Sequence, residues 1–382
     1  MMLKKGFVFA FLTGILFFIT ACGDEIQQSP VFYETENPTN LSDWNILHIQ
    51  IQTLYLSDRV VPYDLNSPLF TDYAHKLRTV WLPEGTTASY RDKEALDFPV
   101  GTIISKTFYY PTPNGSPQGG ATVVHSDDKT AQHLNPGLNL SAVRLMETRL
   151  LVHRKDGWVA LPYVWTDDQS DAILKRTGDI KKLELIGRGE GRENFAYIIP
   201  NANQCAGCHA TNATTRDIAP IGPKARHLNK DYPYADGVKN QLVAWQDMGI
   251  LVDLPDEKWP QNVDWKASNA SLNKRARSYL DINCSHCHNP VGAADTSGLL
   301  LEPSTPDGTN LGRCKIPIAA GTGTGNRIFD IVPGKPDASI LTYRMHSTNP
   351  AVMMPELGRS LSHTEGVALI SEWITAMNGT CE

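Results

Sequence analysis

Residues 43 to about 195 show a pattern of apolar and polar positions that is typical of short β-strands. The stretch FPVGTIISKTFYYP is a β-favouring run bounded by proline and glycine, and ETRLLVHRKDGWVALPYVW contains two such runs around Asp156-Gly157. An Asp-Gly pair between two β-favouring runs is a strong hairpin signal. We therefore expect an antiparallel β-sandwich or barrel over residues 43–195.

Residues 269–382 show helical periodicity instead. A predicted amphipathic helix runs straight into the stretch NCSHCHN; its apolar positions are Leu272, Ala276, Tyr279 and Leu280. A second helix is expected near the C-terminus, where a capping box of Ser362 and Glu365 would begin it and Gly379 would end it. The apolar face of this second helix would carry Val367, Ile370, Trp373, Ile374 and Met377.

The connecting segment, residues 196–268, contains one more helical pattern, GVKNQLVAWQDMGIL. Its apolar positions on one face are Val238, Leu242, Trp245 and Met248. The expected fold is therefore a β-rich N-terminal domain, a short segment over residues 196–268 that carries the motif QCAGCHA, and a mainly α-helical domain over residues 269–382.

The first 42 residues are typical of an export signal and a linker. Two lysines precede an apolar run over residues 7–19, which is too short for a comfortable membrane span, so residues 1–21 read as a signal peptide. The run ends in ITAC, which resembles the bacterial lipobox and makes Cys22 the expected lipidated N-terminus; the alternative is an ordinary signal that leaves Cys22 as a free thiol. Gly23 is similar to the residue found in lipoproteins sorted to the outer membrane. Residues 22–42 are polar and aperiodic, and we expect a flexible tether.

Length and charge narrow the possibilities further. A chain of 382 residues is long enough for two or three domains, and its 25 prolines and 29 glycines indicate many turns. The formal charge of −6 comes with no basic stripe, so nucleic acid is not an expected partner.

The cysteines form a regular set. There are seven: Cys22, two in QCAGCHA, two in NCSHCHN, and Cys314 and Cys381. In an oxidising compartment the last two are most simply a disulfide, and the alternative is two separate buried thiols.

The two CxxCH motifs, Cys205-Cys208-His209 and Cys284-Cys287-His288, predict two covalently bound c-type haems. On a helical turn, residues i and i+3 share a face and i+4 lies beside them. Both thiols can therefore bond the two vinyl groups at one edge of a porphyrin, while the adjacent imidazole ligates the iron. Zinc is the main alternative, but the 75 residues 209 to 283 separate the CxxC pairs, against about 15 to 20 in common zinc sites. A thioredoxin-like redox pair would leave each trailing histidine unexplained.

The second haem has a candidate sixth ligand. Met354 in MMPELGR is followed by a proline that fixes its loop, whereas the nearby Met353 and Met345 are alternatives, because methionines often fill cores. His286 lies inside the second motif and cannot fold back to the iron that its neighbours hold. We expect His346 and His363 to be surface groups.

The sixth ligand of the first haem is open. Met248 and His227 are the local candidates, and five upstream histidines are others: His48, His75, His125, His133 and His153. An iron with no sixth ligand could bind and activate small molecules, which would favour an enzyme.

Several stretches together resemble an uncharacterised bacterial family of exported dihaem c-type cytochromes, over nearly the whole mature chain. They are YDLNSPLFTDYA, FPVGTIISKTFYYP, ETRLLVHRKDGWVALPYVWTDDQSDA, IPNANQCAGCH, LDINCSHCHNP, PGKPDASILTYRM and MMPELGR. The resemblance implies haem binding and electron transfer but no settled reaction. The C-terminal motifs are also similar to single-domain cytochromes c, whose Met-Pro loop supports Met354 as a ligand.

These observations predict a lipid-anchored dihaem cytochrome c on the periplasmic face of the bacterial envelope, most simply at the outer membrane, which passes electrons to a partner protein. One alternative is a haem enzyme similar to bacterial dihaem peroxidases. Another is a sensor whose β-rich domain docks a partner or a sugar.

Overall fold

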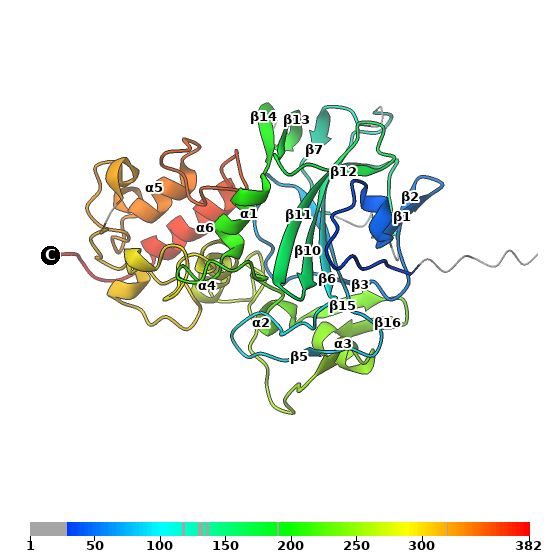
Figure 1. Cartoon of the computed structure of the whole chain (residues 1–382). Coiled ribbons are helices and arrows are strands. Elements are labelled where there is room, and N and C mark those ends of the chain that lie inside the picture. The colour runs from blue at the N-terminus through cyan, green and yellow to red at the C-terminus, as the bar shows by residue number, and fades with distance from the viewer. Residues whose placement is uncertain (1–28, 117–118, 129–132, 135–136, 189–190, 319) are drawn as a thin grey trace, which may run out of the picture.

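The computed structural model describes residues 29–382 except 117–118, 129–132, 135–136, 189–190 and 319. A β-rich region comes first along the chain and a region of short helices follows, with α4, α5 and α6 gathered on one side of the strands (Figure 1). This order agrees with the predicted order of elements. The expected signal peptide and Cys22 lie outside the described residues. No helix in the described part of the chain has both the length and the apolar character needed to cross a membrane.

The centre of the β-rich region is a sheet whose described strands have the order β12-β11-β10-β6-β4-β3, all antiparallel neighbours. β10 and β11 form the predicted hairpin, with Arg154 paired to Gly157 across the turn. Gly157 has a φ of 111°, a conformation that favours glycine. The strands are β3 (Val61–Tyr63), β4 (His75–Trp81), β6 (Ile103–Pro111), β10 (Val143–Arg154), β11 (Gly157–Trp165) and β12 (Ala172–Leu174).

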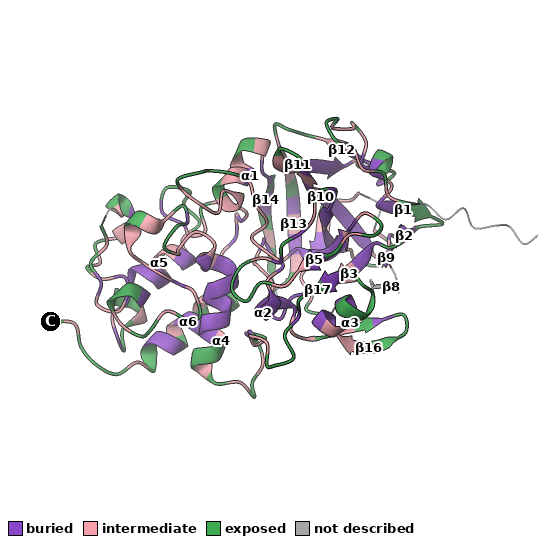
Figure 2. Cartoon of the chain, turned by 60° about the horizontal axis from the view of Figure 1, so that its bottom comes forward, coloured by how far each residue is buried: buried purple, intermediate pink, exposed green. Residues whose placement is uncertain are grey.

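The central sheet separates two apolar cores, because successive side chains of a strand point to opposite faces. Ile103 of β6 packs against a second, four-stranded sheet, which forms a sandwich with the central one. Ile104, the next residue, packs into a different core on the opposite face. Figure 2 shows the buried strands of the central sheet. The flanking sheets are β1 (Leu47–Gln50), β2 (Thr53–Leu56), β9 (Gly137–Asn139) and β8 (His133–Leu134), and β14 (Gly191–Ile199), β13 (Asp179–Arg188) and β7 (Thr122–Val124), of which β7 and β13 are parallel.

The prediction that residues 22–42 are a flexible tether is wrong for the described part, residues 29–42. Phe32 and Tyr33 pack against the sandwich core. The guanidinium of Arg154 donates hydrogen bonds to the backbone carbonyls of Tyr33 and Thr35, at 3.1 and 3.2 Å. The sequence does not predict this ordered segment, because hydrogen bonds to its backbone carbonyls help to hold it in place and leave no periodic apolar pattern. A 3-10 turn (Leu41–Trp44) follows.

Residues 196–268 carry short helices and strands that pack on the central sheet. Leu242 and Trp245 of α3 pack with Ile104 on the central sheet. The predicted helix begins only at Gln241: Val238 lies on a strand and is 72% exposed, and Met248 is 43% exposed. The elements are α1 (Ala202–His209), α2 (Ala225–Leu228), β15 (Asp231–Tyr234), β16 (Gly237–Asn240), α3 (Gln241–Asp247) and β17 (Leu251–Val252), which pairs in parallel with β5 (Ala88–Ser89).

The C-terminal region contains α4 (Leu272–Leu280), α5 (Ile340–His346) and α6 (Thr364–Thr375). Apolar residues of α4 and α6 share one core, as their sequence patterns predict; these include Ala276, Leu280, Ile370 and Trp373. The predicted capping box is wrong, because α6 is preceded by His363 and the hydroxyl of Ser362 donates to the carbonyl of Met345. The region is joined to the β-rich part through the Asp72 carboxylate, which accepts the backbone N–H of Leu361 at 2.7 Å.

Cys314 and Cys381 form a disulfide with an S–S distance of 2.09 Å and a Cα–Cα distance of 5.3 Å. The bond spans 67 residues of sequence and ties the chain end to the loop before α5. A structural disulfide of this kind is typical of exported proteins.

Replacing both disulfide cysteines by serine should lower the free energy of unfolding by about 3–4 kcal/mol, because the open chain gains conformational entropy when it unfolds. Urea unfolding of the Cys314→Ser/Cys381→Ser variant measures this. Reduced wild-type protein serves as the control and should match the variant. An unchanged unfolding midpoint would contradict the expected role of the bond.

Candidate functional site

The first CxxCH motif lies on α1, which a capping box begins. The side chain of Asn201 accepts the backbone N–H of Gln204 at 2.8 Å, and the Gln204 side chain accepts the backbone N–H of Asn201 at 2.9 Å. Within this short helix Cys205 and Cys208 are three residues apart and share a face, and His209 lies beside them. The local sequence therefore presents two thiols and an imidazole in one direction.

The ring of His209 is held in a fixed orientation. Its Nδ1 lies 3.0 Å from the carbonyl oxygen of Ala219, so Nδ1–H donates and Nε2 is left for another partner. Burial, with a contribution from the nearby Lys106, lowers the pKa of His209 to about 3. A neutral imidazole whose other nitrogen donates to a carbonyl is the usual form of a metal-ligating histidine.

These three side chains line a cavity, which we call the α1 cavity. It lies between α1, the central sheet (β4, β6, β10 and β11) and residues 355–358, and its empty space of about 1290 Å³ includes open solvent at the mouth. Apolar walls come from residues such as Leu65, Ile104, Phe108, Leu151 and Ile221, and cationic groups come from Lys76, Arg78, Lys106 and Arg149.

This lining fits a haem. Apolar walls suit a flat macrocycle, and cations suit its two propionates. Arg149 is a fixed cation, since its guanidinium donates to the Glu147 carboxylate at 2.6 and 2.7 Å, while Tyr197 donates to the same carboxylate at 2.9 Å. Burial lowers the pKa of Lys106 to about 7.

The second motif follows α4 without a loop. Ser271 caps α4 by accepting the backbone N–H of Lys274 at 3.4 Å, and the helix continues into a π-helical turn (Asp281–Ser285) that carries Cys284. The ring Nδ1 of His288 lies 3.5 Å from the Ser297 hydroxyl. Burial lowers the pKa of His288 to about 4, so its imidazole is also neutral.

The fold brings the two motifs into contact although 75 residues, 209 to 283, separate the CxxC pairs in the sequence. The Cys287 thiol donates to the carbonyl oxygen of Gly207, inside the first motif, at 3.7 Å. A Cβ at position 207 would lie 2.9 Å from the Leu357 side chain, so glycine leaves room for Leu357 beside α1. The sequence gives no signal for this contact.

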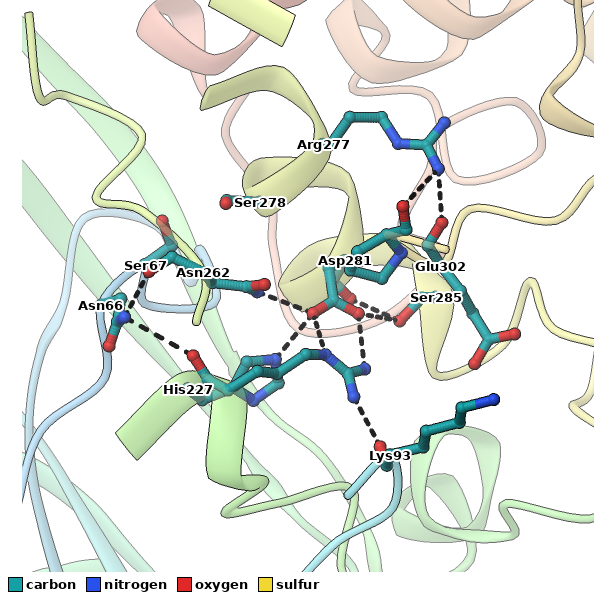
Figure 3. A network of polar contacts seen from close by, with 12 residues as sticks. Asn66, Ser67, Lys93, His227, Asn262, Arg277, Ser278, Asp281, Ser285 and Glu302 are labelled. Atoms are coloured by element: carbon teal, nitrogen blue, oxygen red, sulfur yellow. Dashed lines mark hydrogen bonds and ion pairs between the residues drawn. The ribbon is translucent and has the colours of Figure 1, made fainter. Parts of the chain in front are cut away.

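A buried carboxylate positions the second motif (Figure 3). The Asp281 side chain accepts hydrogen bonds from Arg226 at 2.7 and 2.9 Å, from Asn262 at 2.7 Å and from the Ser285 hydroxyl at 2.7 Å. His227 Nε2 lies 2.8 Å from the same carboxylate. Although burial alone would raise it, these partners hold the pKa of Asp281 well below its usual range.

The structure shows which candidate sixth ligands of the first haem lie at the α1 cavity. His227 lines the α1 cavity, but Asp281 engages its Nε2. Met248 is not part of the cavity lining. The upstream candidates also lie elsewhere: His48 faces Ser57, His75 the carbonyl of Ser126, His125 the ring of Tyr73 and His153 the carbonyl of Phe98, and His133 lies on β8.

His286 is the cavity histidine that the sequence did not assign. It lines the α1 cavity together with His209 and His227. Its Nδ1 is buried and has no hydrogen-bond partner within the described residues. The position of His286 between two attachment cysteines was the available signal.

Hydrogen bonds of the backbone hold Met354 in its loop. Its N–H donates to the carbonyl of Arg344 at 3.0 Å, its carbonyl accepts from Arg359 at 2.9 Å, and Arg344 contributes to the lowered pKa of His288. Met345 and Met353 are buried, Met345 in the α4–α6 core.

His346 is exposed as expected. His363 is not a surface group: it stacks on Phe70 at 4.3 Å and faces the Tyr279 hydroxyl at 2.9 Å.

Among the described residues, no three His, Cys, Asp or Glu side chains come together in a way that could hold a metal ion, as a zinc site requires. Redox-active thiols have lowered pKa values, whereas burial raises the pKa of all four motif cysteines.

Comparison of the chain with models of protein families, with curated proteins and with solved structures finds no match.

Replacing Asp281 by Asn should lower the free energy of unfolding by about 3–5 kcal/mol at neutral pH, because Arg226 stays buried without its counter-charge. The folded pKa of Asp281 is depressed, so its stabilisation is present above its unfolded pKa of about 4 and is lost as the pH falls toward the folded value. Wild-type stability should therefore fall more steeply with acid than that of Asp281→Asn.

Urea unfolding at a series of pH values measures both effects. The exposed Asp256→Asn is the matched control and should behave as wild type. Parallel pH profiles for wild type and Asp281→Asn would show that the carboxylate is not held as described.

Proposed function

We propose that the protein is an exported, lipid-anchored dihaem c-type cytochrome that carries electrons in the periplasm. The observation that carries this proposal is the contact between the two CxxCH motifs, with the Cys287 thiol 3.7 Å from the Gly207 carbonyl. Two motifs in contact would hold two haems close together, which an electron carrier needs and which independent structural sites do not.

Each residue has a defined part in this proposal. Cys205 and Cys208 would hold the first haem through thioether bonds and His209 would ligate its iron. Cys284 and Cys287 would hold the second haem in the same way. His288 and Met354 would ligate its iron. Haem iron supplies one-electron redox chemistry when bound. Arg149 and Lys106 would neutralise propionates in the α1 cavity, and its apolar walls would exclude water.

The compartment follows from separate features. The signal-like residues 1–21 and the lipobox at Cys22 support export and attachment to the periplasmic face of a bacterial membrane, with Gly23 favouring the outer membrane. The disulfide of Cys314 and Cys381 supports an oxidising compartment. A redox partner protein would dock from the same compartment.

A haem enzyme similar to bacterial dihaem peroxidases is the second candidate. Lys106 favours it, since a buried amine whose pKa is lowered to about 7 beside a haem could donate a proton to a bound oxidant. Carbon monoxide distinguishes the two: a carrier with two six-coordinate irons does not bind it, whereas an enzyme with an open iron does.

Protein made in a host that matures c-type cytochromes should carry two covalent haems, measured by mass and by the pyridine haemochrome spectrum. Cys205→Ser/Cys208→Ser and Cys284→Ser/Cys287→Ser should each retain one, because each pair holds its own haem. Cys314→Ser/Cys381→Ser is the matched control and should retain two. A wild-type protein with the mass of its polypeptide and lipid alone would refute the proposal.

Met354→Ala should convert one haem from low spin to high spin and lower its reduction potential, because a Met–His pair raises the potential. Electron paramagnetic resonance and redox titration measure the two effects. Met353→Ala removes a neighbouring, buried methionine and should leave the spectrum unchanged. The reverse result would assign the ligand to Met353.

A further inference from the structure

We propose that His286 is the sixth ligand of the first haem, so that the second attachment motif supplies a ligand to the iron held by the first. This inference rests on the proposed function, because it requires a haem in the α1 cavity. His286 is neither an attachment cysteine nor the iron-ligating histidine of either CxxCH motif.

The position of His286 supports this role. The residue lies between Cys284 and Cys287 but lines the α1 cavity, which also contains Cys205, Cys208 and His209. His286 is near enough to His209 to contribute to the lowered pKa of that ring. Within this short turn, His286 lines the α1 cavity, whereas Cys284 and Cys287 are not part of its lining.

The ring of His286 also lacks the partner that the other buried imidazoles have. His209 faces the Ala219 carbonyl, His227 faces Asp281 and His288 faces the Ser297 hydroxyl. Nδ1 of His286 is buried without a hydrogen-bond partner within the described residues. A buried polar atom without a partner calls for an explanation, and a missing ion is one of the common ones.

The other donors in the cavity are less suited. His227 is engaged by Asp281, and the Lys76 ammonium donates to the carbonyls of Leu69 and Ala74 at 2.9 and 3.0 Å. Lys106 is the main competitor, because its buried amine loses its proton readily. It extends from a strand on a long flexible stem, whereas His286 lies next to a turn that Asp281 fixes through Ser285.

This ligand would set the direction of electron flow. A His–His pair at the first iron gives a lower potential than a Met–His pair at the second. Electrons would therefore pass from the first haem to the second, across the contact between Gly207 and Cys287. It would also leave no open iron for substrate.

The test uses the full haem-loaded protein and compares His286→Ala with Lys106→Met. His286→Ala keeps Cys284, Cys287 and His288, so both haems should remain attached. Half of the low-spin signal in the electron paramagnetic resonance spectrum should be lost, carbon monoxide should bind at one haem per protein, and added imidazole should restore the low-spin signal. Lys106→Met removes the competing amine: both irons should stay low-spin, while the loss of a cation near the propionates should lower the reduction potential of the first haem.

Wild-type protein labelled with nitrogen-15 histidine gives a second readout that does not depend on a variant folding. Electron–nuclear double resonance should detect two imidazole nitrogens on one haem and one on the other. The inference fails if each iron carries one histidine, if His286→Ala keeps the wild-type spectrum, or if Lys106→Met is the variant that becomes high-spin. Any of these results with two attached haems overturns the ligand alone, whereas a wild type without haem overturns the proposed function as well.

Discussion

The arrangement of the candidate site depends on the buried carboxylate of Asp281. It receives Arg226, His227 and Asn262 from a segment that packs on the β-sheet, and it sits at the start of the turn that carries the second CxxCH motif. A buried charge of this kind is tolerated only when its partners are all in place. Because those partners come from another part of the chain, the carboxylate fixes the second motif against the β-rich region and therefore against the α1 cavity.

The β-rich region contributes directly to the candidate site. Its central sheet packs one face into a sandwich, while the other face forms a wall of the α1 cavity and supplies Lys106 and Arg149. The first haem would therefore be bound between a β-sheet and a short helix, whereas the second would lie in the helical region. The loop that carries Met354 continues into Pro355 and Leu357, which line the α1 cavity.

The sequence predicts the features that local patterns encode. The β10–β11 hairpin and the apolar faces of α4 and α6 follow from turn chemistry and spacing, and both are present in the structure. The Cys314–Cys381 bond, which follows from the oxidising compartment that the signal peptide predicts, is present as well. The order of residues 29–42 and the packing of residues 196–268 on the sheet could not be predicted, because hydrogen bonds to Arg154 and contacts with Ile104 leave no periodic signal. The meeting of the two motifs and the cavity position of His286 depend on contacts between distant segments. No local pattern carries that information.

Anomalous X-ray diffraction at the iron edge of the haem-loaded protein tests the central claim most directly. We expect two iron peaks, one in the α1 cavity next to His209 and one next to His288. A single peak, or an α1 cavity without iron, would contradict it.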